Sequence, residues 1–316
     1  MRRTTAVATV VDMQPPAAGT LRILHLSDTH LTGDGALHQG AVDTTAALDR
    51  LLGHLDDLPG VGLVVVSGDV SEDGTPASYT AVRERIGGWA ERHGAALVAV
   101  PGNHDLREGF RQVLANGHVL GEGGHPLAHT MEYLPPEVPV SGQSVVAGRR
   151  IVTVDTSVPG AGYGEIDGTS LERLHAALAG EPAPHGTVVV LHHPPLPAPT
   201  ELHEALRLQN PDALADALRG SDVRVVLGGH YHHHFAGSLA GVPVLVAPGV
   251  ANDTDVTGAH DEESATLDSG ALVVDVAADG SVWSTPVRAP RPEGEPLAFH
   301  IDAATVASVI AVAGKH

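Results

Sequence analysis

One pattern limits the possible folds of this 316-residue chain more than any other, and it occurs five times. Each time, an apolar run typical of a buried β-strand ends in a short polar segment that contains Asp, Asn or His. The five segments are Asp28-Thr29-His30, Gly68-Asp69, Gly102-Asn103-His104-Asp105, His192-His193-Pro194 and Gly229-His230-Tyr231-His232. Because open α/β sheets gather their functional loops at the carboxyl ends of their strands, we expect the five segments to lie together at one site.

The order of predicted strands and helices indicates an α/β domain. Apolar runs predict buried strands over residues 21–26, 61–66 and 95–100, and helical spacing of apolar residues predicts helices over 40–58 and 76–92. This β-loop-α order requires right-handed crossovers and a largely parallel sheet.

The second half of the chain predicts further strands. The same sheet is expected to continue with strands over 144–147, 151–155, 187–191 and 223–227, and helices are expected over 169–179 and 211–219. Three later runs with hairpin-like spacing suggest a second sheet packed against the first, over 242–247, 271–276 and 281–287.

We divide the chain into a flexible leader, one large domain and a tail. The leader, residues 1–20, shows no periodicity, and a carboxylate interrupts its short apolar part, which argues against a signal peptide. The main domain spans 21–290 and includes a small cap over about 106–143, where no period is sustained. The tail, 291–316, contains a short apolar helix over 303–313 that we interpret as a docked tail or a subunit contact.

Composition excludes several classes of function. The chain has no cysteine, so disulfides and thiolate metal sites are excluded, and a cytoplasmic location is expected. Its formal net charge of −20 repels nucleic-acid polymers and anionic lipid, and no apolar run is long enough to span a membrane. The expected partner is therefore a small molecule.

The side chains of the five segments are metal ligands of a particular kind. They offer carboxylates from Asp28 and Asp69, an amide oxygen from Asn103, and several imidazoles. The imidazoles are those of His30, His192, His230 and His232. Divided over two divalent ions, these groups give each ion about four protein ligands if one carboxylate bridges, which leaves positions open for water and substrate. Mixed oxygen and nitrogen donors suit transition metals such as manganese, iron and zinc.

Two of the segments place candidate ligands two residues apart, as Asp28 and His30 and as His230 and His232. In an extended strand end, such residues point to the same side, so each pair is expected to close on one cluster. Glycines are expected to let the backbone turn toward bound ions at positions 68, 102, 228 and 229.

The series of segments resembles that of the calcineurin-like metallophosphoesterases, whose motifs are D-x-H, G-D, G-N-H-D, H and G-H-x-H. All five motifs occur here in that order between residues 26 and 232. Residues 26–30, 154–160 and 191–195 resemble more narrowly the bacterial class III cyclic-nucleotide phosphodiesterases and nearby glycerophosphodiesterases.

The resemblance implies a four-layered αββα sandwich of two mixed β-sheets with a small cap and a dinuclear metal site. By match to the motifs, one ion would be held by Asp28, His30, Asp69 and His232. The other ion would be held by Asp69, Asn103, His192 and His230, with Asp69 bridging. Whether His192 or His193 is the ligand stays open, although the family pattern favours His192.

The resemblance also implies the reaction. A water or hydroxide between two ions of Mn²⁺, Fe²⁺/Fe³⁺ or Zn²⁺ would attack phosphorus in line with the leaving oxygen. The catalytic residues would be Asp69, Asn103 and His104, and His104 would protonate or orient the leaving group. We interpret Asp105 as a residue that orients His104.

The substrate that the resemblance implies is a small phosphodiester, with 3′,5′-cyclic AMP or GMP, hydrolysed to the 5′-monophosphate, as the leading choice. The alternative is a glycerophosphodiesterase or phosphomonoesterase on the same site. A non-catalytic scaffold is disfavoured because all the motif residues are present, and a polynucleotide nuclease is disfavoured by the acidic charge. The resemblance further suggests a homodimer paired through the cap.

Overall fold

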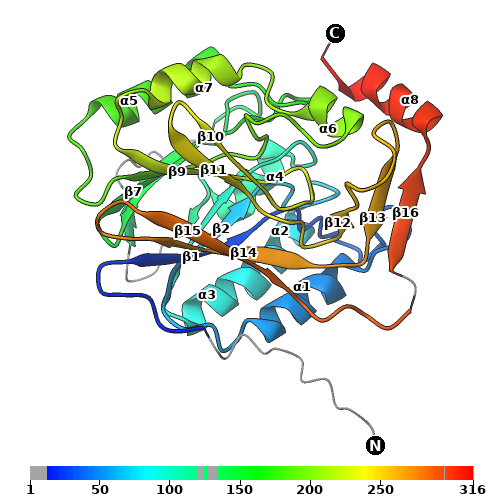
Figure 1. Cartoon of the computed structure of the whole chain (residues 1–316), viewed down its shortest axis with the longest axis horizontal. Coiled ribbons are helices and arrows are strands. Elements are labelled where there is room, and N and C mark those ends of the chain that lie inside the picture. Colours follow the sequence, from blue (N-terminus) through cyan, green and yellow to red (C-terminus); the bar gives the residue numbers. More distant parts are fainter. Residues whose placement is uncertain (1–12, 120–123, 127–133, 295, 316) are drawn as a thin grey trace, which may run out of the picture.

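A computed structural model of the chain describes residues 13–119, 124–126, 134–294 and 296–315. Most of the predicted leader and the middle of the predicted cap lie outside these residues. Two β-sheets face each other, with α1 and α3 against one outer face and α5 and α7 against the other (Figure 1). The fold is therefore the predicted αββα sandwich.

The first sheet has the strand order β15-β14-β1-β2-β3-β4. Strands β1, β2 and β3 are parallel to one another, and β14 pairs with β1 in the antiparallel sense. The strands of this sheet are β1 (Leu21–Leu26), β2 (Val61–Ser67), β3 (Ala96–Val100), β4 (His118–Val119), β14 (Gly270–Val276) and β15 (Val282–Arg288).

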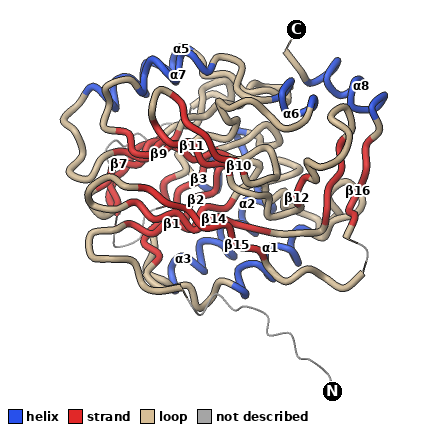
Figure 2. Tube along the Cα trace, in the orientation of Figure 1, coloured by secondary structure: helices blue, strands red, loops and turns tan. Residues whose placement is uncertain are grey.

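The second sheet has the strand order β10-β11-β9-β8-β7-β6-β5, in which β7, β8, β9 and β11 run parallel. Its strands are β5 (Gly124–Pro126), β6 (Gly142–Val146), β7 (Arg149–Thr153), β8 (Thr187–Val190), β9 (Val223–Gly228), β10 (Phe235–Leu239) and β11 (Val242–Val246). A small third sheet contains β12 (Asp253–Thr254), β13 (Glu263–Thr266) and β16 (Leu297–Ile301) beside the C-terminal helix (Figure 2).

The helices lie close to their predicted positions. They are α1 (Thr44–His54), α2 (Pro76–Val82), the π-helical turn η2 (Arg83–Gly87), α3 (Gly88–Arg92), α4 (Arg107–Leu114), α5 (Gly168–Ala179), α6 (Glu201–Leu206), α7 (Pro211–Leu218) and α8 (Ala303–Ala313). The helix predicted over 40–58 is shorter, because the Asp43 side chain accepts a hydrogen bond from Ala46 N and begins α1 there. No helix of the described residues is long and apolar enough to cross a membrane.

Two predictions about the fold are wrong. The strands expected over 144–227 do not continue the first sheet, because they form the second one together with β11. The runs at 271–276 and 281–287 do not belong to the second sheet, because they pair beside β1. Each apolar run shows that a strand is buried, but its pairing partner is set by contacts with other segments of the chain, which for β1 and β14 join Leu24 to Val273.

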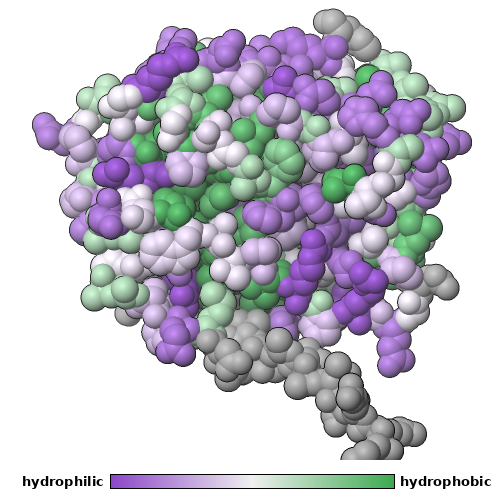
Figure 3. Space-filling model, viewed as in Figure 1, coloured by the Kyte–Doolittle hydropathy of each residue, from purple (hydrophilic) through white to green (hydrophobic). Residues whose placement is uncertain are grey.

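Three apolar clusters hold the layers together. Side chains of both sheets, such as Val65 and Val190, fill the space between them. On the outer face of the first sheet, Leu48 and Leu51 of α1 pack into a second cluster, and Leu174 of α5 belongs to a third cluster on the outer face of the second sheet. Outside these layers, hydrophilic side chains cover much of the face seen in Figure 3. The cores fix the strand ends, and thereby the loops that follow them.

Candidate metal centre

The five polar segments follow β1, β2, β3, β8 and β9, and the structure brings them together, as predicted. Backbone hydrogen bonds join neighbouring segments: Asp28 N donates to Gly68 O over 3.1 Å, and Gly229 N donates to His192 O over 2.9 Å. The two sheets are also joined here, because His230 N donates to Asp28 Oδ2 over 3.0 Å. The site therefore lies at the carboxyl ends of strands from both sheets.

The first predicted ligand set forms one cluster. Ligand atoms of Asp28, His30 and His232 all lie within 4.8 Å of one another. His30 Nε2 lies 3.1 Å from His232 Nε2 and 3.5 Å from Asp69 Oδ2. His232 Nε2 is also 3.5 Å from Asp28 Oδ1. Two imidazole nitrogens and two carboxylates thus lie close together in one cluster.

The second predicted ligand set lies beside the first. His192 Nε2 is 3.4 Å from Asp69 Oδ2 and 3.2 Å from Asn103 Oδ1. His230 Nδ1 lies 3.3 Å from the same His192 nitrogen. Because Oδ2 of Asp69 is close to both His30 and His192, this carboxylate lies between the two sets, where a bridging ligand would be.

The donor set fits divalent cations. Asp28 and Asp69 are buried, with 0% and 2% of their surface exposed, and no Lys or Arg of the described residues lies within ion-pairing distance of either one. Buried carboxylates need a compensating positive charge. It can come from protonated imidazoles or from bound metal ions, and mixed carboxylate and imidazole donors suit transition metals.

The pKa values of the cluster show how strongly it attracts positive charge. Burial acts against protonation of His192, but the charge of Asp69 outweighs it and raises the pKa of His192 to about 9. The pKa of Asp69 lies well below its usual range, because the charges of His192 and His104 outweigh the opposing effect of burial. Burial raises the pKa of Asp28.

The candidate ligands have an unusual backbone, which the sequence pattern does not predict. Positive φ angles occur at Asp28 (55°), His30 (44°), Asp69 (46°), His230 (72°) and His232 (47°). The extended conformation expected for the Asp28/His30 and His230/His232 pairs is therefore wrong. A left-handed residue costs about 1–2 kcal/mol, and such strain is typical of functional sites, where the surrounding structure enforces it.

Glycines allow the close approach of the segments, as predicted for three of the four positions. Gly68 has a φ of 95°. A Cβ atom on Gly102 would lie 2.2 Å from Asp69 Oδ1, and one on Gly229 would lie 1.7 Å from Ser27 Oγ. The expectation is wrong for Gly228, where a Cβ would make contacts of ordinary length, the nearest at 3.5 Å.

The two neighbouring histidines 192 and 193 point to different partners. His192 turns Nε2 to Asp69 and Asn103, while its Nδ1 lies 2.7 Å from the carbonyl oxygen of Ser67. His193 places Nδ1 2.8 Å from Thr156 Oγ1. This geometry favours His192 as the ligand.

One residue of the site, Glu72, is absent from the sequence-based prediction. Its Oε2 atom lies 2.7 Å from His30 Nδ1 and 3.1 Å from His104 Nδ1. The Asp105 carboxylate, which was predicted to orient His104, instead accepts hydrogen bonds from backbone N–H groups of Val70, Ser71 and Gly102. The local sequence does not mark Glu72 as a site residue. Its carboxylate reaches the two histidines only because of the course of the loop that follows Asp69.

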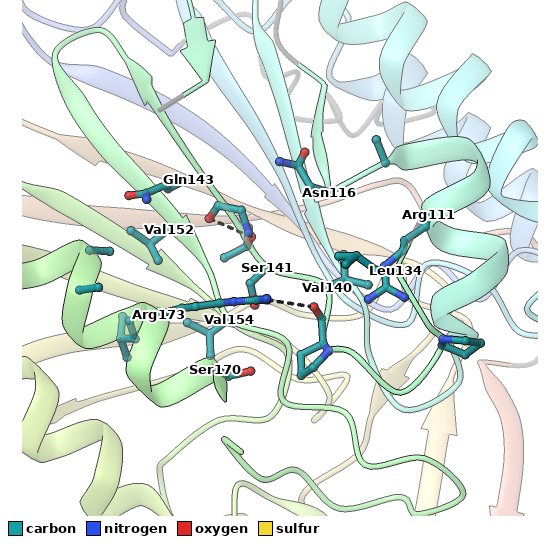
Figure 4. A pocket seen from close by; sticks show the side chains of 18 of the residues that line it. Arg111, Asn116, Leu134, Val140, Ser141, Gln143, Val152, Val154, Ser170 and Arg173 are labelled. Atoms are coloured by element: carbon teal, nitrogen blue, oxygen red, sulfur yellow. Dashed lines mark hydrogen bonds between the residues drawn. The ribbon is translucent and has the colours of Figure 1, made fainter. Parts of the chain in front are cut away.

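Two cavities are present among the described residues, and only the smaller one reaches a predicted ligand. One, of about 460 Å³, is lined by Asn103 and by apolar side chains that include Leu106, Val158 and Pro159. A larger one, of about 660 Å³, lies between α4, α5, β6 and β7, where Arg173 donates to Pro139 O over 3.4 Å (Figure 4). None of the predicted ligands lines the larger cavity, so we associate the smaller one with the site.

Comparisons with known proteins support the assignment of the site that was made from the motifs. The family model described as Calcineurin-like phosphoesterase matches residues 21–234. The cAMP/cGMP dual specificity phosphodiesterase of Mycobacterium tuberculosis is 38% identical over 239 residues, which cover 74% of this chain and 69% of that protein. A probable cyclic nucleotide phosphodiesterase of Rhodococcus erythropolis is 35% identical over 236 residues, which cover 74% of this chain and 72% of that protein.

A solved structure shows the same fold. GAP50, the anchor in the inner membrane complex of Plasmodium, aligns with a TM-score of 0.56 at 14% identity, over 94% of this chain and 95% of that one. At this identity the likeness concerns the fold alone. The sequence matches confirm the resemblance seen in the motifs, and the chain belongs to the calcineurin-like phosphoesterase family.

Proposed function

We propose that the protein hydrolyses small phosphodiesters, with 3′,5′-cyclic AMP or GMP as its preferred substrates, at a centre of two divalent metal ions. The observation that carries the proposal is the convergence of two ligand sets that share Asp69. The ligands are Asp28, His30, Asp69, Asn103, His192, His230 and His232. Relatives at 35–38% identity bear the names of cyclic-nucleotide phosphodiesterases, which supports the substrate class.

The metal ions would be Mn²⁺, iron or Zn²⁺, in accordance with the donor types. When bound, they would supply the Lewis acidity that activates water and neutralises charge on the phosphate. Asn103 lines the 460 Å³ cavity, and its side chain also contacts His192. This volume lies in the range of pockets for small ligands, so a mononucleotide can lie there with its phosphate toward the ligand sets.

His104 is the residue that we assign to the leaving group. Burial opposes its protonation, but the charge of Asp69 and the contact with Glu72 outweigh it and raise the pKa of His104 to about 9. These contacts favour the protonated form of the imidazole. With Nδ1 against Glu72, the Nε2–H group is left to donate a proton to the oxygen that leaves phosphorus.

Turnover and metal content test the proposal together. We expect purified protein with Mn²⁺ to convert cyclic AMP to 5′-AMP faster than it hydrolyses 5′-AMP or glycerophosphocholine. Asp69→Ala should lose both activity and bound metal, whereas Asp73→Ala, which removes an exposed carboxylate from the same loop, should keep both. Faster turnover of 5′-AMP than of cyclic AMP would contradict the assignment of the substrate class.

Two further features stay predictions, namely the cytoplasmic location and the homodimer paired through the cap. The division into a leader (1–20), a main domain (21–290) with a cap over about 106–143, and a tail (291–316) likewise stays a proposal.

A further inference from the structure

The larger cavity, of about 660 Å³, is separate from the predicted metal ligands, none of which lines it. Its inner wall is formed by apolar side chains that are at most 4% exposed, namely those of Val140, Val152, Val154 and Leu174. At its rim, Gln112 and Arg173 are exposed, so a ligand can enter from solvent. A cavity of this volume, with apolar walls and few polar groups, is typical of sites for small ligands.

The charge around this cavity is the reverse of the charge of the whole chain. Arg111 extends from α4 and Arg173 from α5, and one carboxylate, that of Glu108, also lines the cavity (Figure 4). The whole chain, in contrast, has 38 Asp and Glu against 18 Lys and Arg. Within the described part of the chain, the recorded side-chain bonds of both arginines go to carbonyl oxygens and not to carboxylates.

These carbonyl oxygens hold the two guanidinium groups in place without neutralising them. Arg111 donates to Pro135 O over 3.1 Å and also to Val138 O. Arg173 donates to Pro139 O over 3.4 Å. A guanidinium carries several N–H donors and keeps its charge in proteins, so both groups can still donate to an anion.

Positive charge is concentrated around Arg111. Burial lowers the pKa of Arg111, and the charges of Arg107 and Arg173 lower it further, whereas the charge of Asp155 acts in the opposite sense. Arg107 is already paired with Asp155 over 2.8 Å. An anion that enters the cavity would therefore compensate the charges of Arg111 and Arg173, which lack such a partner among the described residues.

We propose that the larger cavity is a second binding site, for a small organic anion with an apolar body. The anionic group would accept hydrogen bonds from Arg111 and Arg173, because guanidinium groups match the geometry of carboxylates and phosphates. The apolar body would cover Val152 and Leu174, and the burial of apolar surface would supply affinity. This inference does not depend on the proposed hydrolysis.

The smaller cavity is a neighbour of this site, because Glu108, Gln112 and Pro136 line both cavities. The two differ in their functional groups, since Asn103 lines only the smaller one and the two arginines line only the larger one. An anion can also bind to metal ions, so the test uses metal-free protein and variants of both sites.

Calorimetric titration with 2-naphthoate and with the uncharged 2-naphthalenemethanol tests the anion site. In protein kept in EDTA, we expect naphthoate to saturate a single site with a Kd below about 1 mM, as a ligand of this size allows. The alcohol should bind at least about 10-fold more weakly, because hydrogen bonds to a charged group are the stronger ones. Equal affinities for the two compounds, or no binding of naphthoate, would overturn the proposal.

Arg173→Gln should weaken the binding of naphthoate at least about 10-fold, because the variant loses one of the two charges. Arg219→Gln is the matched control, since Arg219 is an exposed arginine that pairs with Asp216 and lines neither cavity. The control should bind naphthoate with an unchanged Kd. An equal loss in both variants would show that the net charge of the protein, and not the cavity, determines binding.

Ala176→Trp tests the location of the site by filling the cavity. Ala176 is an exposed residue of α5 that lines the cavity, so the substitution leaves the buried core intact, and it should abolish the binding of naphthoate. Ala179→Trp places the same ring at an exposed position of α5 outside the cavity and should keep the binding. Full affinity in Ala176→Trp would overturn the assignment of the cavity.

Asp69→Ala separates this site from the metal centre. Since Asp69 does not line the larger cavity, the variant should bind naphthoate with the Kd of the unaltered chain. Loss of binding in Asp69→Ala would show that naphthoate binds at the metal centre and would overturn the proposal. Because these titrations require neither Mn²⁺ nor turnover, a protein that fails to hydrolyse cyclic AMP can still confirm the anion site.

Discussion

Arg107 donates through Nε to the Oδ2 oxygen of Asp155 over 2.8 Å, and this buried ion pair joins the start of α4 to the segment after β7. The same guanidinium donates to the carbonyl oxygens of Glu137 and Ser157, each over 2.8 Å. Arg107 follows the loop of Asn103 and His104, so the pair fixes that loop of the first sheet against the second sheet.

Arg107→Met should therefore destabilise the fold strongly. Removing one partner leaves the buried Asp155 carboxylate without its positive charge, which costs about 3–5 kcal/mol. Urea denaturation at neutral pH measures this loss. Arg85→Met removes an exposed ion pair with Asp49 and should cost less than about 1 kcal/mol. A similar loss in both variants would refute the importance of the Arg107 pair.

Gly102→Ala should damage the metal centre. The new methyl group would lie 2.2 Å from Asp69 Oδ1 and 2.5 Å from Asp69 N, so the carboxylate between the two ligand sets must shift. We expect at least about a 10-fold loss of Mn²⁺ affinity, since displaced contacts around a metal site have effects of this size. Metal titration followed by elemental analysis of the purified variant measures it.

Gly53→Ala is the control for that substitution, because Gly53 lies in α1 and a Cβ there meets nothing within 4 Å. It should leave metal affinity unchanged and stabilise the protein by about 0.5–1 kcal/mol, because alanine is the better helix former. Normal metal content in Gly102→Ala would contradict the close-packing argument.

Removal of metal should lower the melting temperature. Bound cations compensate the buried carboxylates of Asp28 and Asp69, and a ligand present at about 100 times its Kd stabilises the folded state by about 2.7 kcal/mol. Differential scanning calorimetry with EDTA and then with excess Mn²⁺ should show a reversible shift. The melting temperature of Asp69→Ala should rise much less on addition of Mn²⁺. A full rise in that variant would show that the stabilising Mn²⁺ binds at another site.

Stability should decrease in mild acid because of His25. This side chain is fully buried, with Nε2 2.8 Å from Ser67 Oγ, and burial lowers its pKa from 6.5 to about 3. Between these pH values the unfolded chain binds a proton that the folded chain excludes, so the free energy of unfolding decreases as pH falls below 6.5.

From pH 6.5 to pH 4 the contribution of His25 amounts to about 3 kcal/mol, at 1.36 kcal/mol per pKa unit. Urea denaturation of the metal-free protein across this range should show a shallower decline for His25→Gln. His175→Gln removes an exposed histidine on α5 and serves as the control. Parallel curves for His25→Gln and the unaltered chain would show that His25 does not cause the decline.

The sequence by itself determined the parts of the protein that local patterns encode. Continuous apolar runs such as Val61–Val66 mark the buried strands, and the polar segments that follow such runs contain all seven candidate ligands. The order of the motifs implies the layered fold. These properties depend on residue type and on neighbours in the sequence, so they can be recognised from the sequence alone.

Only the tertiary structure decided which strands pair and how the side chains of the candidate ligands are oriented. Val273 pairs with Leu24, although the two lie far apart in the sequence and the run around Val273 gives no sign of that partner. The left-handed backbone at Asp28 and His30 and the contact of Glu72 with His104 likewise arise from packing between distant segments. Such contacts depend on the positions of residues that are far apart in the sequence, and a local pattern carries no information about those positions.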